Sequence, residues 1–232
     1  MMERIRKALS GPRSRSTGVV YLLYFLTAIL GAVLTPGTPN DIVVHEPLFR
    51  WGFAVSTISL ALYVAVIALF YNLLRPVNRS LALLATFFGI VGCAVQAFGS
   101  LFQLAPLVVL GGSQYKSAFN SDQLHALAQM LLDLSVQAGY IGIVFFGAFD
   151  IVIGYLIFRS TFVPRVLGVL MVLAGLSWLS FLSPPLANHL LTPIEILGFL
   201  AEAALMLWLL VLGVNVQQWN AQARPVEASV NT

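Results

Sequence analysis

Residues 75–79 read RPVNR and residues 159–165 read RSTFVPR, and each of these short turns lies between two long apolar runs. Each turn carries two arginines and a proline, which belong at the edge of a membrane rather than inside it. Short basic loops are typical of the cytoplasmic side. The two turns therefore predict pairs of helices that cross a membrane and return, joined on the cytoplasmic side.

Working outward from these turns gives six apolar runs, at residues 18–35, 51–74, 80–110, 121–158, 164–182 and 193–215. Each run has the roughly 20 residues needed to cross about 30 Å of hydrocarbon as a helix. The chain of 232 residues is 59% hydrophobic and only 9% charged, whereas a soluble domain is about 25% charged. The sequence predicts an all-α, polytopic membrane protein with a bundle of six transmembrane helices.

Ten of the twelve basic residues fall on one side of this bundle, namely Arg4, Arg6, Lys7, Arg13, Arg15, Arg75, Arg79, Arg159, Arg165 and Arg224. Only Arg50 and Lys116 fall on the other side. This asymmetry predicts that both termini are cytoplasmic. We expect a basic cytoplasmic segment at 1–17, a transmembrane domain at 18–215 and a cytoplasmic tail at 216–232. The basic residues sit where they meet lipid headgroups, which disfavours binding of nucleic acid.

The third and fourth runs are longer than a membrane requires. As single helices, residues 80–110 would span about 46 Å and residues 121–158 about 57 Å. We expect both helices to continue past the outer surface as a hairpin, closed by the sequence GGSQYKSAFNS at 111–121. Strong tilt, or a break at Pro106 or Gly139, is the alternative.

Two acids are predicted to lie within the membrane. Asp150 is nine residues from Arg159, or about 13 Å from the inner edge, and Glu202 is thirteen residues before Asn215, or about 20 Å from it. Glu195 shares a helical stripe with Glu202 but lies at the outer interface. Carboxylates inside a membrane are costly and often mark ion or substrate pathways. They can also be structural, and Thr86, Tyr24 or Ser177 on neighbouring helices could bond to Asp150.

A row of polar residues opens the fourth run, with His125, Gln129, Asp133 and Gln137 at four-residue steps. Such a face could hold a ligand or a metal ion. It could equally be the hydrated face of the protruding hairpin. The depth count favours the hydrated face, because it places all four residues at or above the outer interface.

Small and amide residues form a stripe in the third run, at Gly89, Gly92, Gln96, Gly99 and Gln103. Small residues allow helices to approach closely, and glutamines bond across the contact, so helix packing is the favoured interpretation. Gln96 is also predicted to be a partner of Glu202, because both fall in the outer half of the membrane.

Metal and cofactor sites find little support. His45, Glu46 and His189 lie in outer loops and could join His125 around a metal ion, but no compact ligand spacing supports this. The single cysteine, Cys93, excludes an intrachain disulfide and a cysteine-based zinc site. The chain has no Walker loop, no GxGxxG and no GxSxG. We expect no metal and no cofactor.

The turn sequences LLRPVNRSLALLA at 73–85 and GYLIFRSTFVPRVLGVL at 154–170, with YKSAFNSDQLHALAQ at 115–129, resemble the domain-of-unknown-function 4386 family. The resemblance covers residues 18–215. It implies a multi-pass protein of the bacterial cytoplasmic (inner) membrane. It transfers no activity and no functional residues.

The leading functional hypothesis is a binding or transport-type protein for a small molecule, lipid or ion, with a polar cavity in the outer half of the bundle. Glu202 and Gln96 would form its floor, Asp133 and His125 its mouth, and Asp150 a deeper proton-titrating position. A membrane-embedded enzyme that modifies lipids is an alternative, although an enzymatic role is disfavoured. A structural subunit without a ligand is a third hypothesis. Membrane lipids are expected partners, and a homo-oligomer is left open.

Overall fold

The computed structural model describes residues 14–35 and 37–230, without the side chains of 184, 186–188, 191 and 224–230. Within these ranges the chain is helical and contains no strand. Six of the described helices, or continuous helical segments, are long and apolar enough to cross a membrane. The protein is therefore a multi-pass membrane protein built as a helical bundle, as the sequence predicts.

The long helices are α2 (Ser14–Leu34), α4 (Glu46–Leu74), α5 (Arg79–Ser100), α8 (Ser121–Arg159), α9 (Arg165–Trp178) and α10 (Pro184–Val211). The shorter elements are α3 (Pro39–Val44), α6 (Ala105–Gly111), α7 (Ser113–Ala118), α11 (Val216–Val230) and the 3₁₀ turns Leu101–Leu104 and Leu179–Leu182. The predicted basic segment 1–17 lies mostly outside the described residues. The predicted C-terminal tail contains a helix.

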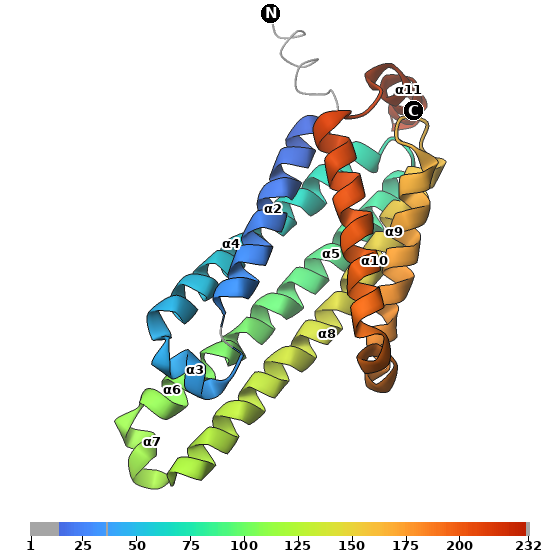
Figure 1. Ribbon diagram of the computed structural model, residues 1–232. Helices are drawn as coiled ribbons and strands as arrows, with labels where there is room; N and C mark the ends of the chain where they lie inside the picture. The colour runs from blue at the N-terminus through green and yellow to red at the C-terminus, as the bar shows by residue number, and fades with distance from the viewer. Residues whose placement is uncertain (1–13, 36, 231–232) are drawn as a thin grey trace, which may run out of the picture.

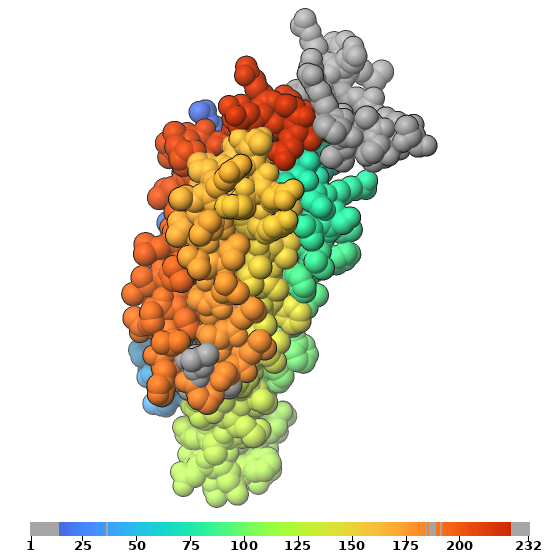
Figure 2. Space-filling model, turned by 90° about the vertical axis from the view of Figure 1, so that its right-hand side faces the viewer, coloured from blue at the N-terminus to red at the C-terminus, as the bar shows by residue number. Residues whose placement is uncertain are grey.

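The third and fourth apolar runs differ in continuity. α8 runs unbroken for 39 residues through Gly139, whereas the third run is interrupted by the 3₁₀ turn before α6, which has Pro106 in its first turn. The third run thus changes to 3₁₀ geometry just before Pro106 but stays helical from Arg79 to Gly111. α6 packs against α8, and α3 packs against both. They form a tip that extends beyond α2 and α9 (Figure 1) and below α10 in the space-filling view (Figure 2). That this tip is on the outer side stays a prediction.

The opposite end of the bundle gathers the two basic turns, the start of α2 and the end of α10 (Figure 1). Gly213, with φ 70°, ends α10 in a backbone conformation that favours glycine. The Ser14 hydroxyl accepts a hydrogen bond from the Val214 N–H at 3.2 Å. The Trp219 indole N–H of α11 donates to the Leu73 carbonyl oxygen at 2.9 Å. These bonds tie the start of α2 to the linker after α10, and α11 to the end of α4.

α8 and α9 pack closely through glycines. A Cβ placed on Gly154 would lie 2.7 Å from the Gly168 carbonyl oxygen, and one placed on Gly147 would lie 2.8 Å from that of Gly175. Both pairs are seven residues apart on their helices, so each pair occupies one face. Small residues at these positions let two membrane helices come into backbone contact. This contact fixes the position of Asp150, which lies between the two glycines of α8.

Candidate functional site

Asp150 and Glu202 lie at one depth in the bundle. α10 ends at Val211, so Glu202 is nine residues from the end of its helix, as Asp150 is from Arg159 at the end of α8. At 1.5 Å per residue both acids are about 13 Å from the basic end, near the middle of a hydrocarbon layer about 30 Å thick. Because α10 ends four residues before Asn215, Glu202 lies nearer to the end of its helix than the count from Asn215 gave. The two acids therefore form a pair. In the sequence-based hypothesis, Glu202 was part of the cavity floor and Asp150 lay at a separate, deeper position.

Residues of α2 and α4 complete the surroundings of this pair. The Tyr21 hydroxyl of α2 donates a hydrogen bond to Glu202 Oε2 at 3.1 Å, and Tyr21 is only 2% exposed. Asp150 and Glu202 are close enough to interact electrostatically. Both carboxyl groups also interact electrostatically with the phenol groups of Tyr21 and of Tyr63 on α4. Four helices thus converge on two carboxyl groups and two phenol rings.

Asp150 is the most unusual member of the cluster. It is 1% exposed, and neither carboxyl oxygen has a hydrogen-bond partner among the described residues. Two partners proposed from sequence are occupied elsewhere, because Thr86 and Ser177 each donate to a carbonyl of their own helix. The indole N–H of Trp178 on α9 lies near the Asp150 carboxyl group and interacts with it electrostatically. Its position does not meet the geometry of a hydrogen bond.

Among the side chains that the structure describes, no cation balances these two acids. Within the described residues, the only carboxyl or basic group that interacts electrostatically with one of these acids is the other acid. The one ion pair recorded among the described residues joins Arg50 to Glu46, and both of these side chains are exposed. A buried carboxylate without a counter-charge costs several kcal/mol, so this pair is suited to holding protons or a small cation.

Aromatic rings enclose the acids. The Tyr24 ring lies 4.6 Å from the Tyr63 ring between centroids, and Tyr63 makes an edge contact with Phe149 at 6.2 Å. Phe149 and Tyr21 both contact Phe70. These rings limit the space around the carboxyl groups, and the Tyr21 hydroxyl reaches Glu202.

Gln96 does not pair with Glu202 as predicted. A Cβ placed on Gly142 of α8 would lie 2.9 Å from Gln96 Cγ, so Gln96 packs into the contact between α5 and α8. Nearby, a Cβ on Gly92 would meet the Phe146 ring at 2.5 Å, and one on Gly99 would meet Ala138 at 2.7 Å. The polar and small stripe of the third run therefore serves helix packing, the interpretation that the sequence favoured.

The predicted mouth of the cavity lies far from the acid pair. His125 and Asp133 are exposed residues of the unbroken helix α8, so they are about 38 Å and about 26 Å along its axis from Asp150. Gln129 donates to Asp133 Oδ1 at 2.8 Å along the same helix. A single cavity containing all of the predicted residues is therefore wrong. Glu195, on α10, is also exposed.

His125 belongs to a separate surface feature. It lines a pocket of about 410 Å³ between α3, α6, α7 and α8, together with Asn40 and Lys116. Its Nδ1 lies 2.9 Å from the Ser121 carbonyl oxygen. No three or more His, Cys, Asp or Glu residues in the described part of the chain are grouped so that they could hold a metal ion.

The sequence did not single out Tyr21, Tyr63 and Trp178 as functional candidates. Tyr24, three residues after Tyr21, was considered only as a bonding partner of Asp150. A weak signal was available, since tyrosines at mid-membrane depth are uncommon away from the interfaces that they usually occupy.

The family model described as a domain of unknown function, DUF4386, matches residues 16–213. The chain belongs to this family. No curated protein and no solved structure matches it. The DUF4386 match extends from the first turns of α2 to Gly213, so it contains all six long helices and both acids, and it ends before α11. The description of the family assigns no activity.

Proposed function

We propose that this DUF4386 protein is a small binding or transport-type protein in which Asp150 and Glu202 together bind protons or a small cation at the middle of the membrane. The observation that carries the proposal is the buried, unpartnered carboxyl group of Asp150 beside a second acid. We further propose that it resides in the cytoplasmic membrane of bacteria, with its basic end in the cytoplasm.

The position of the pair supports transport. Transporters commonly place their ion sites near the bilayer midplane, between helices that move relative to each other. Here the two acids come from α8 and α10, and the tyrosine that bonds to Glu202 comes from α2. A proton or cation bound at this point would neutralise charge that no other described residue neutralises.

A purely structural role explains the pair less well. An acid with a structural role inside a membrane is expected to form hydrogen bonds with neighbouring helices. Asp150 forms none with the described residues. The alternative of a lipid-modifying enzyme is supported by no specific feature of the described residues.

Ion flux through the purified protein tests the proposal. The full chain would be reconstituted in liposomes that contain a pH-sensitive dye, with a potassium-valinomycin potential driving proton entry. We expect faster acidification than in protein-free liposomes. Asp150→Asn and Glu202→Gln should each return the rate to background. Glu195→Gln is the matched control, because it changes an exposed acid on the same helix, and it should leave the rate unchanged.

A second arm replaces the potassium-valinomycin potential with a sodium or potassium gradient, and the pH-sensitive dye with one that responds to that ion. It distinguishes the proton from a cation as the occupant of the site. The proposal is overturned if the wild-type protein passes none of the three ions faster than protein-free liposomes. It is equally overturned if the double variant Asp150→Asn, Glu202→Gln retains the wild-type rate.

A further inference from the structure

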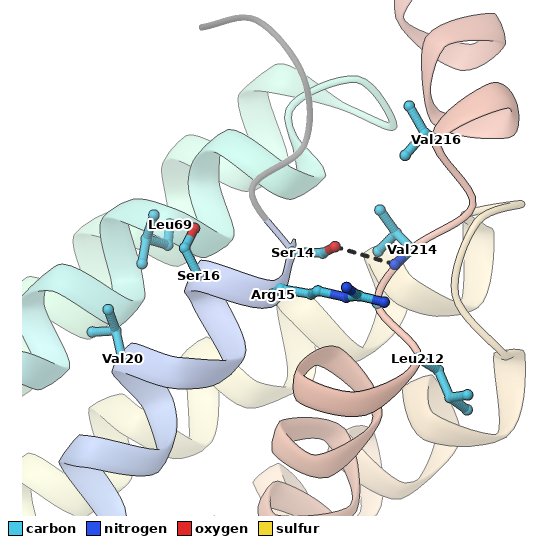
Figure 3. A pocket seen from close by; sticks show the side chains of 9 residues that line it. Ser14, Arg15, Ser16, Val20, Leu69, Leu212, Val214 and Val216 are labelled. Atoms are coloured by element: carbon cyan, nitrogen blue, oxygen red, sulfur yellow. Dashed lines mark hydrogen bonds between the residues drawn. The ribbon is translucent and has the colours of Figure 1, made fainter. Parts of the chain in front are cut away.

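A second pocket, of about 780 Å³, lies at the basic end of the bundle, between the start of α2, α4 and the linker from α10 to α11 (Figure 3). Its lining includes Arg15 and Ser16 at the start of α2, and Val20, Leu69 and Leu212. It contains neither of the acids described above. The bond from the Val214 N–H to the Ser14 hydroxyl runs along one wall (Figure 3).

The polar side chains of the lining, Ser14, Arg15 and Ser16, stand at the start of α2, beside the apolar linker residues Leu212, Val214 and Val216, and the deeper lining is apolar. Val20 is five residues farther along α2 than Arg15, about 7 Å deeper, and Leu69 lies six residues before Arg75 at the end of α4, about 9 Å deep. The polar end of the groove is thus level with lipid headgroups and its apolar part is level with the first carbons of the acyl chains. A glycerophospholipid likewise has a charged phosphate at the level of the headgroups and apolar acyl chains deeper in the membrane.

Arg15 provides the charge for such a ligand. Its guanidinium makes no ion pair or hydrogen bond with any described residue, and it extends toward the α10–α11 linker beside Val214 (Figure 3). A Cβ placed on Gly213 would lie 3.8 Å from Arg15 Cγ, an ordinary contact distance, so the arginine stem lies directly beside the linker. Guanidinium groups bind phosphate oxygens through two parallel hydrogen bonds.

Close packing closes the groove at its inner side. A Cβ placed on Gly18 would lie 2.5 Å from the Leu210 backbone nitrogen, so α2 and α10 touch directly there. α10 ends one residue later, at Val211, and the linker to α11 begins there. The groove is therefore a local opening at the basic end of the bundle, next to the contact between α2 and α10.

We propose that this groove binds one anionic phospholipid of the leaflet at the basic end. The lipid phosphate contacts Arg15, and an acyl chain lies along Val20 and Leu69. The site is independent of the acid pair, and binding here requires no ion transport.

Native mass spectrometry of the full chain in detergent, with equal concentrations of phosphatidylglycerol and phosphatidylcholine, tests the proposal. We expect the wild-type protein to retain phosphatidylglycerol preferentially. Arg15→Gln should weaken this preference about fivefold, since one basic residue at a membrane surface contributes about 1 kcal/mol to binding of anionic lipid. Leu69→Trp, which fills the apolar part, should reduce retention of phosphatidylglycerol without any change of charge.

Arg159→Gln is the matched control, because Arg159 is an exposed arginine at the same end that does not line the groove. It should keep the wild-type preference. Equal retention of the two lipids by the wild-type protein, or an equal loss in Arg159→Gln and Arg15→Gln, would overturn the proposal. Displacement of the lipid by millimolar inorganic phosphate would also overturn it, because the groove would then be a site for soluble anions.

Discussion

The Tyr21 hydroxyl is the single donor recorded for Glu202 among the described residues. Tyr21→Phe removes only this hydroxyl and keeps the ring contacts with Phe25 and Phe70. We expect a loss of roughly 0.5–2 kcal/mol of stability, the range of side-chain hydrogen bonds inside membranes. Unfolding in mixed micelles with increasing SDS measures the loss. Tyr155→Phe, at a side chain that is 45% exposed, should be neutral, and equal losses in the two variants would contradict the assignment.

At this scale the sequence identified both acids but not their surroundings. Asp150 and Glu202 stand out because each is a charge far from the ends of an apolar run, and distance along a helix converts directly into depth. Their partners depend on how helices are rotated about their axes and which helices are neighbours. Linear spacing does not contain this information, so Gln96 was paired with Glu202 when Tyr21 holds that position.

Among the elements, the contact between α8 and α9 depends on the absence of side chains at its glycines. Gly154→Ala places a methyl group 2.7 Å from the Gly168 carbonyl oxygen, which forces the helices apart and should cost about 1–3 kcal/mol. In Gly139→Ala, on the same helix, the nearest atom is 3.7 Å away. That control should be neutral or gain up to about 1 kcal/mol from helix propensity. The same SDS titration compares them, and a Gly154→Ala protein as stable as its control would refute the close contact.

The elements themselves were largely predictable, because run length, prolines and arginines act locally. The turns at 75–79 and 159–165 and the six long helices follow from these signals. The division of the third run into α5, a 3₁₀ turn and α6 was only one of several alternatives. Pro106 permits a break but does not require one, since proline is tolerated in the first turn of a helix. In the folded chain α3 packs against α6 and α8, a long-range contact that the local sequence does not reveal.

For the whole molecule, the open prediction is its orientation. In a Cys93→Ser background, Asp133→Cys on the tip and Arg75→Cys at the basic end each provide one exposed thiol. We expect a membrane-impermeant maleimide to label Asp133→Cys in intact cells and Arg75→Cys only after the membrane is opened. This follows from the excess of basic residues at one end. The reverse pattern would place the basic end outside, and failure to label Asp133→Cys in opened membranes would place the tip within lipid.

The hydrogen bond from Tyr21 to Glu202 also has a mechanical consequence. Tyr21 belongs to α2, which packs mainly on α4, while Asp150 belongs to α8, which packs mainly on α5 and α9, and α10 touches both α2 and α9. This bond therefore joins the α2–α4 pair to α10, and a change of charge on Glu202 would change the strength of that link. Charge at the centre of the bundle is in this way coupled to the packing of its helices.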